Sequence, residues 1–245
     1  MFTEHISIDE FRSRRQKLCS EIDHQGIVLI QGAPEPLGNS TFDQYKDFLY
    51  LCGLESPRAY LLIDGKNAHT TLYLQHGASM IRESPKPLPC AENAEYIKDL
   101  TGVDSVRGVE ELGGPLSEAS LLYTPFHPEA RSANRKHLVR WAVRLSADPW
   151  DTCATRSAQF VDTIKRQFPQ IQIVDLVPIM DELRLIKSPA EIALLRRAGE
   201  LTAAAVTEAM RSTRPGIMEY QLAAIAQYYY FAGGAKERAY RTKLC

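Results

Sequence analysis

The residues that most often carry metal or acid–base chemistry are spread thinly along this chain. Histidines hold catalytic metals when their spacing brings them to one face of a helix or strand. No two histidines are four residues apart, and no His-Glu-x-x-His motif is present. His69 and His76 border one strand-like segment, but their odd separation puts them on opposite faces of a straight strand. Surface or structural roles are therefore predicted for His5, His24, His69, His76, His127 and His137.

Two acidic segments could supply an acid–base pair, and neither is assigned that role. Asp148–Asp151 contains a proline and indicates a turn, in which Trp150 is expected to pack against the protein. Asp181-Glu182 stands beside Arg184 and Lys187, which favours a charge-balanced, solvated helix. Nucleophile elbows, activated thiols and phosphate-binding glycine loops have no matching pattern here. We therefore assign no catalytic, cofactor-binding or metal-ligating residue.

Composition is that of an ordinary globular protein. The 245 residues are 44% hydrophobic and 24% charged, which excludes wholesale disorder. Lys plus Arg number 29 and Asp plus Glu number 30, so the net charge of -1 supplies no general field for nucleic acid. The short basic run Arg12–Lys17 lies in a helical pattern between Glu10 and Glu21. Nucleic acid is therefore not an expected partner.

Membrane insertion and disulfide formation are also disfavoured. No stretch approaches the roughly 20 apolar residues that span a bilayer, so no membrane partner is expected. The first residues contain an acid and no apolar core, so we expect no secretory signal. The five cysteines are scattered and form no Cys-x-x-Cys pair, which favours a reducing cytoplasm: Cys19, Cys52, Cys90, Cys153 and Cys245.

Hydrophobic patterning predicts an alternation of strands and helices over the first part of the chain. Ser7 and Glu10 form a capping-box pattern that starts a helix reaching Ile22. Residues 32–40 are rich in proline and glycine and predict a loop. Strands are expected at 26–31, 48–51, 59–63, 70–74, 121–123 and 171–174, a hairpin turn at 64–67, a short helix or turn at 110–112, and helices at 92–100, 131–145 and 155–168.

The pattern becomes helical after residue 175. Ser188-Pro189-Ala190-Glu191 is a strong helix start, and apolar residues follow at helical spacing for about six turns. Pro215-Gly216 breaks this helix, and a second helix is expected at 218–232. Four consecutive aromatic residues, Tyr228–Phe231, point in all directions around that helix and predict an exposed apolar patch. We place domains at 1–174 and 175–245 and read the second as the start of a domain.

The segment Arg184–Ile192, followed by Arg197-Ala198, resembles the entry to the pita-bread domain of Xaa-Pro aminopeptidases and prolidases. Pro215-Gly216 with Glu219, and then Tyr230-Phe231, Gly234-Ala235 and Ala239-Tyr240, resemble the elements that follow it in that family. Upstream, Phe48–Leu54 followed by Pro57-Arg58-Ala59 resembles the N-terminal domain of aminopeptidase P. The resemblance covers nearly the whole chain in the family's order.

This resemblance implies a fold and a chemistry. The expected fold is α/β: a creatinase-type, RNase H-like domain with a mixed sheet and flanking helices, then a truncated, mainly helical start of a pita-bread domain. The family hydrolyses the bond after an N-terminal residue that precedes proline, with two divalent ions, typically Mn²⁺. Its five metal ligands lie downstream of the element that is Ala239-Tyr240 here, and none of the five residues after Tyr240 is Asp, His or Glu. No metal is therefore expected to bind this chain.

Two further interpretations stay open beside a broken aminopeptidase, which we take to be inactive alone. The chain could be a non-catalytic module that binds proteins or peptides or forms homo-oligomers, or an unrelated α/β enzyme with a pocket among residues 1–175. Proline-containing peptides are the substrates that the resemblance implies, and a homo-oligomer is expected. The stretch Asn39–Phe48 matches the family weakly, so its role is left open, as is the origin of the stop after Tyr240.

Overall fold

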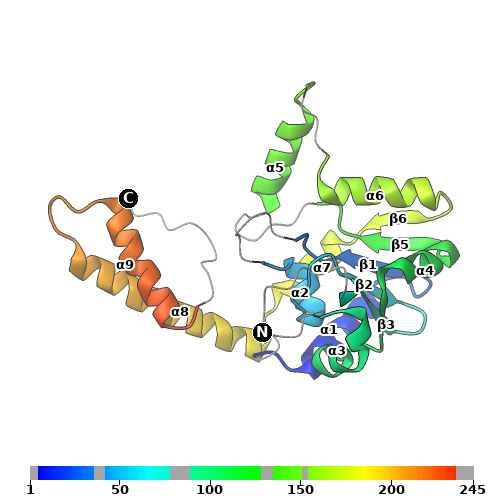
Figure 1. Ribbon diagram of the computed structural model, residues 1–245, viewed down its shortest axis with the longest axis horizontal. Coiled ribbons are helices and arrows are strands. Elements are labelled where there is room, and N and C mark those ends of the chain that lie inside the picture. Colours follow the sequence, from blue (N-terminus) through cyan, green and yellow to red (C-terminus); the bar gives the residue numbers. More distant parts are fainter. Residues whose placement is uncertain (1–4, 36–41, 78–88, 128–134, 151–153, 236–245) are drawn as a thin grey trace. The chain divides into compact units, whose positions relative to one another are not determined.

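The computed structural model describes residues 5–35, 42–77, 89–127, 135–150 and 154–235. The chain divides into two compact units, Met1–Ile186 and Lys187–Cys245 (Figure 1). The helices of the first unit are α1 (Ile8–Glu21), α2 (Lys46–Cys52), α3 (Ala94–Thr101), α4 (Gly113–Glu118), α5 (Arg135–Ser146), α6 (Arg156–Gln167) and α7 (Val177–Leu185), with short 3₁₀ turns η3 (Ala91–Asn93) and η4 (Val109–Leu112).

A six-stranded mixed sheet forms the centre of the first unit, with the strand order β4-β3-β2-β1-β5-β6. Neighbouring strands β1, β2 and β3 pair antiparallel, whereas β4 joins β3, β5 joins β1 and β6 joins β5 in parallel. The mixed α/β fold expected from the sequence is confirmed. The strands are β1 (Ile27–Gln31), β2 (Tyr60–Asp64), β3 (His69–Leu74), β4 (Ser105–Gly108), β5 (Leu121–Thr124) and β6 (Gln172–Asp175).

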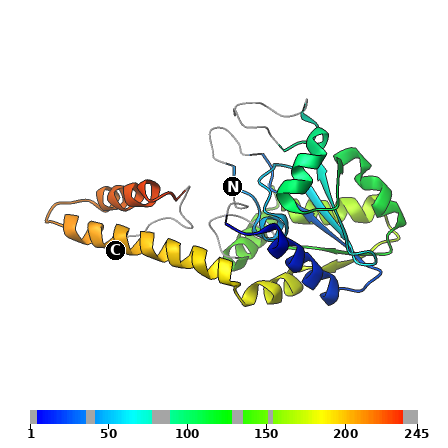
Figure 2. The same cartoon turned by 90° about the horizontal axis from the view of Figure 1, so that it is seen from below.

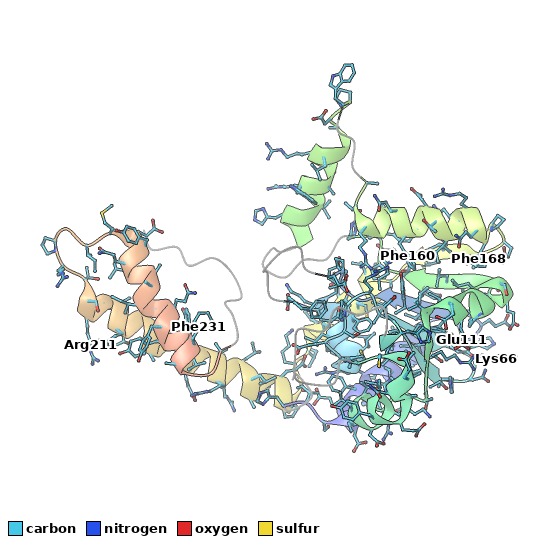
Figure 3. The ribbon with its side chains drawn as sticks, viewed as in Figure 1. Lys66, Glu111, Phe160, Phe168, Arg211 and Phe231 are labelled. Atoms are coloured by element: carbon cyan, nitrogen blue, oxygen red, sulfur yellow. The ribbon has the colours of Figure 1, made fainter. Side chains whose placement is uncertain are left out.

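Both faces of the sheet are covered, because alternate strand residues enter two separate cores. Val28 and Ile30 of β1 join the core that α1, α2, α3 and α7 cover, whereas Leu29 joins the core under α4 and α6. Figure 2 shows the strands between these layers of helices. On α6, the predicted apolar face is confirmed: Ile164 is buried, and Phe160 and Phe168 pack on the sheet (Figure 3).

The prediction of a strand at 48–51 is wrong, because this segment lies in helix α2. Its buried residues, Asp47, Phe48, Leu51 and Cys52, recur at helical spacing. Gly53 then ends the helix in the left-handed conformation at φ 68°, with its N–H donating to the Leu49 carbonyl. A short apolar run followed by glycine fits a strand and a buried helix equally well, and packing decides between them.

Other local predictions are confirmed by the backbone. Ser7 Oγ accepts the Glu10 N–H and starts α1. The expected hairpin turn joins β2 to β3, where Asp64 accepts from the Lys66 N–H and the Asn67 amide. Two elements that we did not predict are β4, a polar four-residue strand at the sheet edge, and α4. The strand β4 has no apolar alternation, so only its pairing with β3 reveals it.

The division between the units follows Ile186, whereas we placed the domain boundary at 174/175. Helix α7 accounts for the difference, because it packs into the first unit. Its Met180, and Leu176 just before it, are fully buried in the core beside α1 and α2. The Leu183 carbonyl also accepts a hydrogen bond of 3.0 Å from the Tyr50 hydroxyl of the same unit.

The second unit contains α8 (Pro189–Ser212) and α9 (Glu219–Ala232). The predicted capping box forms: Ser188 Oγ accepts the Glu191 N–H at 3.1 Å, and the Glu191 carboxylate accepts the Ser188 N–H at 2.8 Å. The residues that the two helices bury are small, namely Ala205, Ala209 and Ala226. Among the described residues, every helix is too short or too polar to cross a bilayer.

Candidate functional site

The structure places the histidines in different surroundings. His69 Nε2 lies 2.8 Å from the Ser105 hydroxyl across β3 and β4. His127 follows β5, and its Nε2 lies 4.0 Å from a carboxylate oxygen of Asp175. His76 lies beyond the end of β3 and contacts two glutamates. In the described ranges, no three His, Cys, Asp or Glu side chains gather in a way that could hold a metal ion, so these residues do not fit a two-metal centre.

His76 is the centre of the densest acid–base cluster of the described residues. Its Nδ1 lies 2.8 Å from Glu92 and its Nε2 lies 2.9 Å from Glu110, so one imidazole bridges η3 and η4. The second carboxylate oxygen of Glu92 accepts the Gly77 N–H at 3.0 Å. Both ring nitrogens therefore face carboxylates, an arrangement that favours the imidazolium and leaves no ring lone pair for a metal. We call His76, Glu92 and Glu110 the His76 bridge.

The pKa values of the His76 bridge shift in the directions that ion pairing requires. Hydrogen bonds to Glu110 and then to Glu92 raise the pKa of His76. The Gly77 N–H and other backbone N–H contacts, together with His76, lower the pKa of Glu92 to about 2. The pKa of Glu110 is lowered mainly by His76. All three side chains are at the surface, so salt screens the bridge. We assign the bridge a structural role, because both ring nitrogens of His76 are paired with carboxylates and the imidazole thereby joins η3 to η4.

We expect the His76→Gln substitution to lower the thermal midpoint most at about pH 5.5 and much less at about pH 9. The raised pKa of His76 means that its contribution is full below about pH 6.5 and is lost as pH rises through the folded value. The lowered pKa of Glu92 means that its contribution is present above about pH 4.5 and is lost as pH falls toward 2. Thermal melts across this range, followed by circular dichroism, measure the difference.

The control for this titration is His69→Gln, because His69 contacts the Ser105 hydroxyl and, within the described part of the chain, no carboxylate. Arg107 and Glu111 form the next ion pair, at 3.1 Å, and remain in both variants. Adding salt is expected to shrink the effect of His76→Gln at about pH 5.5. An equal loss at all pH values would show that His76 acts by packing alone.

A buried ion pair joins α2 to α7. Asp47 is fully buried in the first turn of α2, and its Oδ1 lies 2.6 Å from Arg184 of α7. The other oxygen, Oδ2, is buried without a hydrogen-bond partner among the described residues. Arg184 also lies over the Tyr50 ring, 6.0 Å from its centroid. The arginine that we interpreted as part of a solvated helix is thus a tether for α7, three residues before the second unit begins.

The exposed fractions of the side chains test two other predictions, those for Trp150 and for the aromatic run Tyr228–Phe231. Trp150 is 95% exposed, so the expectation that it packs against the protein is wrong. The predicted turn is present, because Asp148 accepts the Trp150 N–H at 2.9 Å, and this turn leaves the indole in solvent. Asp151 lies outside the described residues. In the second unit, the exposure expected of the aromatic run is found at Tyr228, 67% exposed, and at Phe231, 45% exposed (Figure 3 labels Phe231), whereas Tyr229 and Tyr230 are half-buried.

One recess of the first unit is an open polar groove beside the β2–β3 hairpin and α4, with a volume of about 1050 Å³. Lys66 and Glu111 line it, and the side-chain view shows both at the surface of this unit (Figure 3). Its charges are of mixed sign, and its His69 contacts the Ser105 hydroxyl at 2.8 Å.

Comparison with known proteins identifies relatives of both units. The family model "Aminopeptidase P, N-terminal domain" matches residues 11–120, and the model "Metallopeptidase family M24" matches residues 193–245. The Xaa-Pro aminopeptidase of Escherichia coli is 28% identical over 97% of this chain and 52% of its own length. That of Haemophilus influenzae is 47% identical over 87% of this chain and 45% of its own length. The chain thus spans about half the length of these relatives.

Solved structures of aminopeptidase P are also similar to this chain. The E. coli aminopeptidase P with the inhibitor Pro-Leu superposes with a TM-score of 0.67 at 26% identity, over 94% of this chain and 51% of that one. The same enzyme has been solved with substituted zinc, which places it among metal-binding proteins. The aminopeptidase P model matches the earlier part of the chain and the M24 model the later part, and the structural alignment covers 94% of the chain.

Proposed function

The chain resembles the N-terminal half of the Xaa-Pro aminopeptidases in sequence and in fold, and on this premise we propose that it is the N-terminal portion of such a metallopeptidase. The observation that carries the proposal is that both family models match one chain, in order. The whole protein would release an N-terminal residue that precedes proline and would use two divalent ions, with Mn²⁺ as the proposed metal. Proline-containing peptides would be its substrates. The proposed location is the cytoplasm, in keeping with the free thiols of Cys19, Cys52 and Cys90.

We further propose two domains along the chain, an aminopeptidase P-like domain over 1–174 and the incomplete start of a pita-bread domain over 175–245, with α7 of the second packed into the first compact unit. In this interpretation the first domain contributes shape and assembly surface. The second contributes the first two helices, α8 and α9, of the catalytic domain. Neither contributes metal ligands, since the resemblance puts those after Ala239-Tyr240.

The polypeptide of residues 1–245 is accordingly expected to show no peptidase activity by itself. The test is to add Mn²⁺ and a short Xaa-Pro peptide to the purified chain and to follow the released amino acid. We expect turnover indistinguishable from the peptide blank, because a two-metal hydrolase needs a full set of carboxylate and imidazole donors. The E. coli Xaa-Pro aminopeptidase in the same assay is the positive control. Turnover by this chain that a chelator abolishes would overturn the proposal.

A second candidate function is a non-catalytic module that binds proteins or peptides or forms homo-oligomers. It is favoured by the apolar side chains that the second unit exposes, including Met210 at 71%, Tyr220 at 69% and Leu195 at 58%. Exposed apolar groups on two packed helices are typical of surfaces that associate. Light scattering on the preparation used for the peptidase assay tests this candidate. A homo-oligomer is expected of the aminopeptidase portion as well and is compatible with both candidates, whereas a monomer excludes the module that forms homo-oligomers.

A further inference from the structure

Helix α5 lies in the first unit but buries none of its described side chains. The other α-helices of this unit each bury at least one residue, such as Leu116 on α4 and Ile164 on α6. On α5, by contrast, Trp141 is 55% exposed and Val143 is 62% exposed. A helix of 12 residues is marginal in water unless one of its faces packs against something. The exposed apolar residues of α5 therefore indicate a partner surface.

The sequence of α5 separates apolar from basic residues around the helix. At about 100° per residue, the basic side is an arc of roughly 60° that contains His137, Arg140 and Arg144. All three of these side chains are exposed. Among the described side chains, the apolar residues cover roughly 200° on the opposite side: Trp141, Leu145, Ala142, Val139 and Val143. The helix contains four Lys or Arg residues and no Asp or Glu, which favours an anionic partner.

Both tryptophans of the chain, Trp141 and Trp150, belong to this segment. Trp150 follows the helix and is 95% exposed. Its N–H donates to Asp148 Oδ1 at 2.9 Å, so an ordered turn holds the indole in solvent. Asp148 is the opposing charge at this end of the segment, and the Trp150 N–H compensates part of it. Indole rings favour the zone where lipid headgroups meet water, because the ring is apolar and its N–H is polar.

A lipid surface fits this combination better than a groove on a protein. A helix that binds in a groove presents a stripe of anchors three and four residues apart, such as Trp141, Ala142 and Leu145. The apolar arc of α5 is wider, because Val139 and Val143 extend it to about half of the circumference. A helix lying in the plane of a bilayer immerses such a half and keeps its basic side among the headgroups. A helix of 12 residues is too short to span a bilayer, and one that lies in the surface need not span it.

We propose that α5, together with Trp150, is a docking surface for an anionic lipid bilayer, on which the helix lies with its apolar arc immersed and with Arg140 and Arg144 among the headgroups. The expectation of no membrane partner rested on the absence of a spanning segment, which this mode of binding does not need. Helix α5 lies outside the ranges 11–120 and 193–245 that the two family models match. The proposal is therefore independent of the proposed peptidase function and goes beyond it.

The experiment adds extruded vesicles to the 245-residue chain and follows its tryptophan fluorescence, which reports on this segment because the segment contains both tryptophans. Vesicles of phosphatidylcholine mixed with phosphatidylglycerol are compared with vesicles of phosphatidylcholine alone. We expect a saturable blue shift and co-sedimentation with the anionic vesicles. Both signals are expected to weaken in high salt, because salt screens the attraction between the arginines and the headgroups.

Three variants test the two sides of the helix. Arg140→Gln/Arg144→Gln is expected to weaken binding about thirtyfold at low ionic strength, because each basic side chain at an anionic surface contributes roughly a factor of five. Val143→Gln keeps both fluorophores and is expected to weaken binding several-fold, because it places an amide in the apolar arc. Lys165→Gln/Arg166→Gln is the matched control, since it removes two exposed positive charges from α6 of the same unit, and it should bind as the wild type does.

The outcomes separate a lipid partner from other partners. Equal binding to vesicles with and without phosphatidylglycerol would overturn the proposal, as would equal weakening by the α5 and α6 double variants or co-sedimentation without a blue shift. Soluble polyglutamate tests an acidic protein as the partner, and a larger blue shift with polyglutamate than with anionic vesicles would overturn the proposal in favour of a protein. All substituted side chains are exposed, so circular dichroism is expected to show unchanged folding in each variant.

Discussion

Replacing Arg15 with methionine is expected to lower the free energy of unfolding by about 3 kcal/mol. Arg15 is 4% exposed in α1, and its guanidinium donates to three carbonyls. The acceptors are Leu51 at 2.8 Å, Thr101 at 3.3 Å and Gly102 at 2.6 Å. These carbonyls lie at the C-terminal ends of α2 and α3, where a helix has no partners of its own for them. Methionine keeps the apolar stem and leaves all three carbonyls without this donor.

Urea unfolding followed by circular dichroism measures the change, with Arg12→Met as the matched control. Arg12 lies on the same helix with a 57% exposed side chain and a weaker contact of 3.4 Å to Gly102. We expect its replacement to change stability by less than about 0.5 kcal/mol. Burial lowers the pKa of Arg15, although the group stays charged at neutral pH. Equal effects of the two substitutions would refute the capping role.

Replacing Arg184 with methionine is expected to cost about 2 kcal/mol, because it leaves the Asp47 carboxylate buried and uncompensated. Breaking a fully buried pair costs more, but the Arg184 side chain is 32% exposed and solvent screens part of the interaction. Removal of Arg184 also frees the end of α7, so trypsin is expected to cut near Lys187 faster in this variant. Urea unfolding and timed proteolysis measure the two effects.

The double variant Asp47→Asn/Arg184→Met tests whether the pair is the cause. Removing the buried charge together with its partner is expected to recover more than half of the loss seen in Arg184→Met. If the double variant is instead less stable by the sum of both single changes, the two residues act independently. Arg184 belongs to the segment Arg184–Ile192, which resembles the family. Recovery in the double variant would assign to Arg184 the role of tethering α7 through Asp47.

The segment Arg184–Ile192 has two structural roles, a long-range ion pair from Arg184 and a local cap at the start of α8. Ser188 and Glu191 cap α8 through local hydrogen bonds, whereas Arg184 reaches a carboxylate 137 positions earlier in the chain. The capping box therefore fixes where α8 begins, and the ion pair fixes where α7 ends. Together they define a short connection at Ile186-Lys187 between the two units.

The sequence by itself determined the features that depend on neighbours within a few residues. Capping side chains at Ser7 and Ser188, the hairpin turn after Asp64 and the left-handed Gly102 that ends α3 all follow local rules. The short apolar run of β2 and the apolar face of α6 follow the burial that a core strand and a one-sided helix require. The family resemblance also rests on such local segments, so the sequence alone supports it.

Tertiary structure alone decided which side chains meet across the chain. Arg15 belongs to a short basic run in a helical pattern, yet its guanidinium donates to carbonyls 36 and 87 positions away. Asp47 and Arg184, and the members of the His76 bridge, meet only because the sheet order brings their elements together. Helix α2 and strand β4 likewise depend on what they pack against. Capping and periodicity act over a turn or two of chain, whereas burial and charge pairing depend on the path of the whole fold.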